Sequence, residues 1–445
     1  MAGLFAVRAL RAGREKFDPF GERSSDDDDD DDDNLDDVDE PEDDDTLVTA
    51  PAMKTQARFE KNLAESMADA AFDVSDEPTK KVSLAPITPL ETFWETPCEL
   101  IYEDDDAEVF SVRFSPDDKL LAAGCGDSVV RIFHGDDGRL AYNLEREGSH
   151  SRLPTTCLRW KPAAGGGTKN VLLAANADGT ICHWHVTSRK CLHTISEENN
   201  QVYALDYTPD GSQFATAGKD FAVRVYDEAT KSEVSKLASG WLGAPSAGHS
   251  NRIFSLKFVP QEPQLLLSAG WDNTIQIWDL RTNQPTGSMY GPHVCGDSID
   301  AAGHEVVSGS WRPTKQLQIW DRRNPEQPID VSFRQEGGTA CHLYAAQFSK
   351  PAAEGPQLIA AGGSCANELK LFNRASLEPV GRLGLPRGVY GLDLAHDGRS
   401  VAVAGGDCKV RVMRIPGMSP AGAASAGASP PTGEAKAEAE PVRVE

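Results

Sequence analysis

Short stretches in which apolar and polar residues alternate recur along the chain, each bounded by clusters of Gly, Asp, Pro and Ser. Alternation over five or six residues is typical of β-strands, and the bounding clusters are typical of tight turns. The recurring unit is an apolar-rich strand, a short turn, a second strand that ends in small residues, and a third strand that closes on a large side chain. We therefore predict an all-β protein.

This unit occurs seven times. We predict opening strands at 109–114, 155–160, 202–207, 253–258, 294–299, 343–348 and 389–394. The third strands close on Phe133, Trp184, Tyr226, Trp278, Trp320, Phe372 and Met413, at steps of 41 to 52 residues. That period is typical of the blades of a propeller with loop insertions. A blade buries its faces only against its neighbours, so we predict a complete seven-bladed β-propeller over residues 97–417.

The ring needs a strand from before its first blade. The third strand of blade seven (410–415) is followed by PGMSPAGAASAGASPP, which cannot pair as a fourth strand. The segment CELIYE (98–103) precedes blade one and can pair. We expect it to become the outer strand of blade seven and to remove the free edge. In the turn after the first opening strand, we expect Asp118 to be exposed.

These repeats resemble the WD-repeat family, although the Trp-Asp pair is intact only at Trp278-Asp279 and Trp320-Asp321. In that family a row of His, Ser or Thr, Asp and Trp pins each blade by hydrogen bonds. Blade four matches at all four positions, which are His249, Ser268, Asp272 and Trp278. The turn aspartate recurs at Asp127, Asp178, Asp220 and Asp407, whereas blades five and six lack it. The resemblance implies a protein-interaction scaffold.

Charge is concentrated before the propeller. The chain carries a net charge of −25, and residues 22–45 contribute 17 acids against one base, Arg23. We predict a disordered acidic arm over 1–54, a linker over 55–96 with a short amphipathic helix at 55–72, and a disordered Ala/Gly/Ser/Pro-rich tail over 418–445. Ser24 and Ser25 precede a run of aspartates and are candidate phosphorylation sites.

The charge also restricts the partners. So acidic a chain is a poor direct binder of nucleic acid, and it holds no apolar run of about 18 residues that could insert into a membrane. Asp26–Asp33 should prefer basic protein surfaces. A chaperone of histones or other basic proteins is therefore one alternative function.

Catalytic chemistry is not indicated. The chain has no phosphate-binding loop, nucleophile elbow or zinc-protease motif. His183, His185, Cys191 and His193 have zinc-like chemistry, but they equally suit ordinary positions in outer strands. We predict no enzyme activity, no metal site and no cofactor.

The location expected is a reducing compartment, because the nine cysteines are scattered and odd in number. We expect a cytoplasmic protein, with cytoskeletal and ciliary structures included, and the nucleus is the alternative. The first sixteen residues are apolar and basic, but the acidic run follows too soon for a comfortable mitochondrial transit peptide.

The second residue of each opening strand carries the binding prediction. It is aromatic in five blades, as Phe110, Tyr203, Phe254, Tyr344 and Tyr390. In the family that the chain resembles, this position looks onto the narrow face around the central channel. Adjoining positions add Trp271, Trp311, Arg252, Lys219 and Glu108. We predict a partner-binding surface here, the alternative being that the aromatic residues plug the channel.

A second surface is indicated by the sequences IWDLR and IWDRR in consecutive blades. Their arginines, Arg281 and Arg323, resemble those of substrate receptors of cullin-based ubiquitin ligases, which would imply a ligase adaptor as partner. The alternative is ordinary strand-end chemistry. The leading hypothesis remains a non-catalytic scaffold within a larger intracellular assembly.

Overall fold

The computed structural model describes residues 98–101, 107–146, 153–163, 170–238, 248–334, 338–350 and 357–415. All of them belong to the larger of two compact units, within Pro89–Glu445. The arm with Asp26–Asp33, the candidate phosphorylation sites Ser24 and Ser25, the helix at 55–72 and the tail at 418–445 lie outside the described residues. No helix within the described residues is long and apolar enough to cross a membrane.

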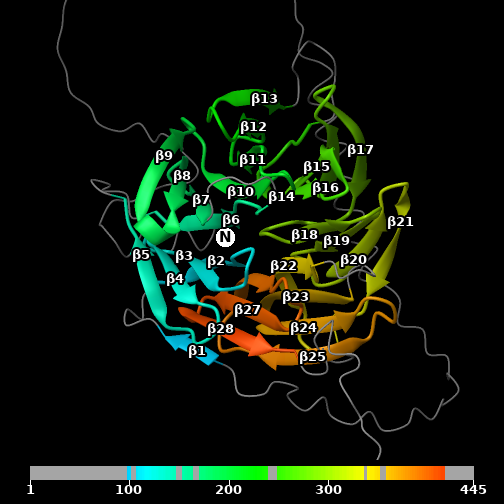
Figure 1. The fold of residues 1–445 in the computed structure, drawn as a ribbon. Helices are drawn as coiled ribbons and strands as arrows, with labels where there is room; N and C mark the ends of the chain where they lie inside the picture. Colours follow the sequence, from blue (N-terminus) through cyan, green and yellow to red (C-terminus); the bar gives the residue numbers. More distant parts are fainter. Residues whose placement is uncertain are drawn as a thin grey trace, which may run out of the picture. The chain divides into compact units, whose positions relative to one another are not determined.

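Seven four-stranded antiparallel sheets follow one another around a ring, as the repeats predict (Figure 1). Blade one contains β2 (Val109–Phe114), β3 (Leu120–Cys125), β4 (Val130–His134) and β5 (Leu140–Leu144). Blade two contains β6 (Thr155–Trp160), β7 (Val171–Asn176), β8 (Thr180–His185) and β9 (Lys190–Ser196), with a short 3-10 helix at Val186–Ser188. Blade three contains β10 (Val202–Tyr207), β11 (Gln213–Gly218), β12 (Val223–Asp227) and β13 (Glu233–Leu237).

The remaining blades repeat this order. Blade four contains β14 (Ile253–Val259), β15 (Glu262–Gly270), β16 (Thr274–Asp279) and β17 (Gln284–Tyr290). Blade five contains β18 (Ile299–Ala302), β19 (Glu305–Gly309), β20 (Leu317–Asp321) and β21 (Asn324–Val331). Blade six contains β22 (Cys341–Phe348), β23 (Leu358–Cys365), β24 (Glu368–Asn373) and β25 (Pro379–Gly384). Blade seven contains β26 (Val389–Leu394), β27 (Ser400–Gly405), β28 (Lys409–Arg414) and β1 (Cys98–Ile101).

The closure of the ring confirms the prediction made for residues 98–103. Strand β1 pairs with β28 in antiparallel register, with Cys98 opposite Val412 and Ile101 opposite Lys409. In Figure 1 the two strands, from opposite ends of the propeller sequence, lie side by side. Blade seven therefore has four strands like the other blades, and the edge of β28 that would otherwise be exposed is paired with β1.

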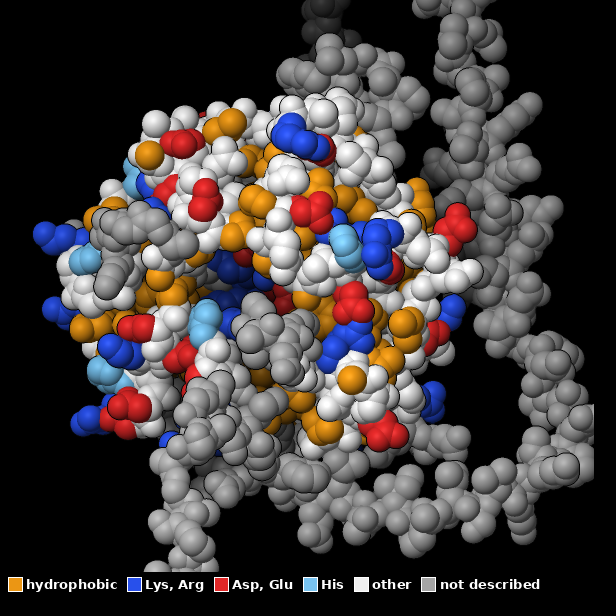
Figure 2. Space-filling model, turned by 45° about the vertical axis from the view of Figure 1, so that its right-hand side comes forward, with side chains coloured by type: hydrophobic (Ala, Val, Ile, Leu, Met, Phe, Trp, Pro, Cys, Tyr) orange, Lys and Arg blue, Asp and Glu red, His pale blue; other side chains and the backbone are white. Residues whose placement is uncertain are grey.

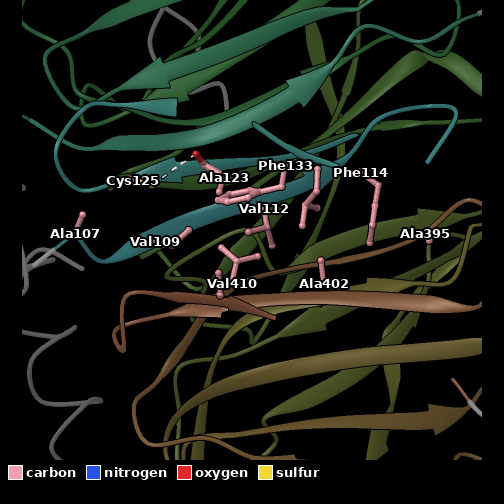
Figure 3. Packing of buried hydrophobic residues seen from close by; sticks show 12 residues of the cluster. Ala107, Val109, Val112, Phe114, Ala123, Cys125, Phe133, Ala395, Ala402 and Val410 are labelled. Atoms are coloured by element: carbon pink, nitrogen blue, oxygen red, sulfur yellow. Dashed lines mark hydrogen bonds between the residues drawn. The ribbon is translucent and has the colours of Figure 1, made fainter. Parts of the chain in front are cut away.

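Blades one and seven also meet through apolar side chains. Val109, Val112 and Phe114 of β2 pack in one buried cluster with Ala402 of β27 and Val410 of β28 (Figure 3). Similar clusters join other neighbouring blades. The core of the propeller thus consists of layers between blades, as expected for strands that are buried on both faces.

The environment of Asp118, at this same junction of blades one and seven, differs from the exposed turn that the sequence predicted. Its carboxylate accepts hydrogen bonds from the backbone N–H groups of His396 and Asp397, both at 2.9 Å, and pairs with the His396 ring. The expectation of an exposed turn residue is therefore wrong, because the turn after β2 lies against the corresponding turn of blade seven. Asp118 bridges the two blades.

Blade five corrects a second prediction. The opening strand was placed at 294–299, but Val294–Ser298 form no strand and β18 begins at Ile299. The reason is a turn at Gly296, where the Ser298 N–H donates to the Gly296 carbonyl at 2.8 Å. A Cβ atom at Gly296 would lie 2.3 Å from the Tyr344 carbonyl oxygen, so the chain passes too close for any other residue. Asp297 is the central residue of this turn and pairs with arginines of blades one and two.

Candidate functional site at the narrow face

One end of the ring is defined by a backbone hydrogen bond that recurs from blade to blade. In blades one to four and in blade seven, the residue after the second strand donates its N–H to the carbonyl just before the opening strand. In blade five the donor, Trp311, is the second residue after β19, and the acceptor, His293, lies six residues before β18. The pairs are Gly126–Glu108, Ala177–Pro154, Lys219–Gln201, Trp271–Arg252, Trp311–His293 and Gly406–Gly388, with N···O distances of 2.8–3.0 Å. These loops therefore lie at one end of the ring, which we call the narrow face.

The five aromatic residues predicted around the channel lie at the start of the inner strands and are buried, with exposed fractions of 2–8%. Phe110 stacks on Tyr390 with ring centroids 5.7 Å apart, and Tyr344 meets Tyr390 edge-on at 5.4 Å. Tyr203 stacks on Phe254 at 4.8 Å. Because these rings pack against one another, they contribute to the packing of the ring. Their part in binding stays a prediction.

More exposed side chains continue this aromatic packing outward on blades four and five. Trp271 lies 5.3 Å from Phe254 and 5.9 Å from His293, and its indole N–H donates to the Cys295 sulfur at 2.9 Å. The guanidinium of Arg252 sits 5.4 Å above the Trp271 ring, which is cation–π geometry. These contacts fix the orientation of Trp271.

Blades five and six share a second aromatic contact at this face. Trp311 is 40% exposed, and its ring lies 4.7 Å from that of His342. It occupies the same loop position in blade five as Trp271 does in blade four. The two tryptophans thus stand on neighbouring blades.

The narrow face is asymmetric. At the equivalent loop positions, blades seven, one and two carry the small residues Gly406, Gly126 and Ala177. Blades three to five carry large aromatic and cationic side chains instead, and we call this group the crescent: Lys219, Arg252, Trp271, His293, Trp311 and Arg312. Glu108, predicted as part of the same surface, lies on blade one and so outside the crescent.

The hydrogen-bonding row of blade four supports the base of this surface. The two ring nitrogens of His249 lie 2.7 Å from Asp272 Oδ2 and 2.6 Å from Ser268 Oγ, and Trp278 Nε1 donates to the same Ser268 oxygen at 2.7 Å. Burial acts to raise the pKa of Asp272, but the hydrogen bond with His249 outweighs it and the pKa lies below its usual value. The carboxylate is thus held charged beside the loop that presents Trp271.

We expect Asp272→Ala to lower the free energy of unfolding by about 1–3 kcal/mol, because it leaves His249 and the Ser250 N–H without their acceptor. The measurement is urea unfolding of the full chain. Asp136→Ala is the control, since Asp136 is exposed in a turn of blade one, and it should change stability by less than about 0.5 kcal/mol. Equal losses in the two variants would contradict the role of the row.

Below the aromatic residues, the inner strands carry a network of buried and partly buried charges that the sequence prediction missed. Asp297 pairs with Arg113 and Arg159, the latter at 2.8 Å, and so joins blades five, one and two. Arg159 also reaches Asp206 at 3.1 Å. Lys257 reaches Asp300 at 3.0 Å. Figure 2 shows basic and acidic side chains together at the floor of the hollow in the middle of the ring.

Three carboxylates of this network connect neighbouring blades through the backbone. Asp206 accepts the Phe258 N–H at 2.8 Å, Asp300 accepts the Phe348 N–H at 3.0 Å, and Asp393 accepts the Phe114 N–H at 2.8 Å. The last of these closes the ring between blades seven and one. The signal was available in the sequence, because the fifth residue of six predicted opening strands is polar where the strand is otherwise apolar. Those residues are Arg113, Arg159, Asp206, Lys257, Gln347 and Asp393.

The hairpin of β8 and β9 in blade two does not bring the four residues considered for zinc together as one set. His183 is opposite His193, but Cys191 is opposite Trp184 and His185 is opposite Lys190. His183 is buried and its Nε2 faces Glu228 at 3.4 Å, whereas His185 is bonded to Ser188. Among the described residues, no group of three His, Cys, Asp or Glu side chains could hold a metal ion.

Arg281 and Arg323 lie at strand ends of blades four and five, at the opposite end of the ring. Each guanidinium pairs with the aspartate two residues before it, Asp279 at 2.6 Å and Asp321 at 2.7 Å. The arginine side chains are 71% and 67% exposed. This pairing is the strand-end chemistry that was the alternative to an adaptor contact, and it leaves both side chains accessible.

Comparison with known proteins adds to this geometry. A model of the WD domain, G-beta repeat, matches residues 189–227 and 245–279, and a model of the anaphase-promoting complex subunit 4 WD40 domain matches residues 91–163. The chain is 24% identical to "Cell division cycle 20.1, cofactor of APC complex" of Arabidopsis thaliana, over 65% of this chain and 60% of the relative. It is 25% identical to a guanine nucleotide-binding protein subunit beta of Nicotiana tabacum, over 51% of this chain and 54% of the relative. The chain thus spans little more than half the length of these relatives.

The fold and the face together define a closed seven-bladed β-propeller with an asymmetric surface at one end of its channel. The repeat matches and the seven-bladed propeller support the WD-repeat family, in agreement with the resemblance seen in the sequence. Propellers of this family serve in general as protein-interaction modules, so protein partners are the expected ligands.

Proposed function

We propose that this chain is a non-catalytic scaffold of a larger intracellular assembly and that it binds a partner protein through the narrow face. The observation that carries the proposal is the crescent, in which aromatic and cationic side chains gather on three adjacent blades of one face. Tryptophan and arginine dominate the binding energy of protein interfaces. At the donor positions of the same hydrogen bonds, blades seven, one and two carry the small residues Gly406, Gly126 and Ala177.

Rigidity supports this proposal. Trp271 is held by Phe254, His293, Cys295 and Arg252. Side chains that are ordered before binding lose less conformational entropy on association. The names of the relatives, a cofactor of a complex and a subunit, are in keeping with a chain that works within an assembly.

We expect Trp311→Ala to weaken binding of the partner proteins that co-purify with the full chain by about tenfold, because an exposed tryptophan at the centre of an interface contributes more than about 1 kcal/mol. The measurement is quantitative affinity purification beside a melting curve. Leu192→Ala is the matched control, since Leu192 is 56% exposed but lies on β9 at the rim. Loss of the same partners from both variants, or from neither, would contradict the proposal.

A ligase adaptor at the opposite end of the ring is the second candidate. What favours it is the pair of exposed arginines on adjacent blades, each fixed by its own aspartate. Such a contact would be lost on Arg281→Ala with Arg323→Ala and kept in Trp311→Ala. The two candidates are thereby separated in one purification experiment.

A further inference from the structure

The cations of the narrow face lack acidic partners. Within the described residues, Lys219, Arg252, Arg312 and Lys315 have no carboxylate in ion-pair distance. The arginines of the third strands differ, since Arg131 of β4 pairs with Asp127 at 2.7 Å and Arg411 of β28 with Asp407 at 2.6 Å. Four cations without an ion pair therefore gather in the narrow-face loops of blades three to five, whereas the corresponding loop of blade seven carries Arg387.

The carboxylates beside the crescent make no ion pair with its cations. Asp220 pairs with Arg224 at 2.5 Å, and Asp272 is hydrogen-bonded to His249 at 2.7 Å and to the Ser250 N–H at 3.2 Å. Burial lowers the pKa of Arg312, and burial together with the charge of Arg312 lowers the pKa of His293. A half-buried guanidinium without a counter-ion is destabilised by desolvation, and an incoming anion relieves that cost.

The aromatic residues favour the same ligand. Arg252 already covers one face of Trp271, so that face is not open to a cation of a partner. Trp311 and Phe221 are each 40% exposed beside the cations and offer apolar surface. A ligand that fits must bring negative charge together with apolar side chains. A purely charged ligand would leave the exposed aromatic rings uncovered, and a purely apolar ligand would leave the cations unpaired.

We propose that the crescent binds an acidic linear segment of a partner protein. Carboxylates of the segment meet Lys219, Arg252 and Arg312, and an apolar side chain between them packs on Trp311. This assignment rests on the proposed function and specifies the chemistry of the partner. It reverses the simplest expectation for a ring of aromatic residues, which is insertion of a cation.

The test uses the full chain and a fluorescent peptide of alternating glutamate and leucine, with a glutamine–leucine peptide as its counterpart. The glutamate peptide should bind more tightly, and its binding should weaken as salt rises because exposed charges are screened. The triple variant Lys219→Ala, Arg252→Ala and Arg312→Ala should weaken binding about tenfold. The triple variant Lys119→Ala, Arg189→Ala and Lys190→Ala removes the same charge from exposed turns at the opposite end of the ring, and it should bind as the unmodified chain does.

Equal affinity for the two peptides, or equal losses in the two triple variants, would overturn the assignment. Equal affinity for the two peptides would show that negative charge on the ligand does not contribute to binding. Equal losses in the two triple variants would show that binding depends on the net charge of the whole molecule and not on the crescent. Failure of the proposed function looks different, because partners would then persist in Trp311→Ala. If that variant loses its partners and the glutamate peptide does not bind, the narrow face remains the interface and only its acidic ligand is wrong.

Discussion

Asp393→Ala should lower the free energy of unfolding of the full chain by about 3–5 kcal/mol, the cost of removing one partner from a buried ion pair. The Asp393 side chain is almost fully buried and pairs with Lys350 at 3.1 Å. It also accepts hydrogen bonds from Gln347 at 3.0 Å and from the Phe114 N–H at 2.8 Å. The substitution leaves these donors without an acceptor at the junction of blades seven and one. Denaturant unfolding measures the loss.

Two comparisons sharpen this prediction. Asp393→Asn keeps an acceptor for Phe114 but removes the charge beside Lys350, so it should cost less than the alanine variant. Burial acts to raise the pKa of Asp393, but Lys350 and Arg113 outweigh it and the pKa is lowered. The contribution of Asp393 is therefore full above the usual carboxyl pKa and is lost as pH falls through the lowered value. An alanine variant as stable as the unmodified chain would show that the pair does not hold the ring closed.

Deleting residues 1–105 should destabilise and aggregate the propeller, whereas deleting residues 1–80 should leave it folded. The longer deletion removes β1 and exposes β28 along its whole length, and an unpaired edge strand is a template for pairing with other chains. Equilibrium unfolding and light scattering of the two truncations measure the difference. If both unfold at the same denaturant concentration without aggregation, β1 does not close the ring.

The number of blades and the closure of the ring could be predicted because both depend on local pattern. Alternation and turn residues recur in every blade, and the segment at 98–103 was identified because residues after 415 cannot pair. The opening strand of blade five was misplaced for the opposite reason. Val294 and Cys295 suggested a strand, but Gly296 and Asp297 interrupt the apolar pattern, and the close approach of Gly296 to Tyr344 is a contact between blades that local pattern does not report.

The sequence predicted which residues belong to the candidate site, but it did not predict how they are arranged in space. The register of the opening strands placed Tyr203 and Phe254 at one depth, and they are in contact. That they are buried follows from the convergence of inner strands around the axis, which alternation along one strand does not report. The grouping of large side chains on blades three to five is visible only in the structure, where equivalent backbone hydrogen bonds show which loop positions correspond. The pairing of Asp297 with Arg113 joins residues far apart in the sequence, and no spacing rule finds it.

Lysine cross-linking of the full chain within its native assembly tests most directly whether the narrow face is the interface. The described propeller offers exposed lysines at both ends of the ring, Lys219 and Lys315 at the narrow face and Lys119 and Lys190 at the opposite end. Cross-links to partner proteins should concentrate on Lys219 and Lys315, and their yield should fall when Trp311→Ala weakens binding of the partner. Cross-links that form from Lys119 and Lys190 while Lys219 and Lys315 stay unlinked would contradict the account.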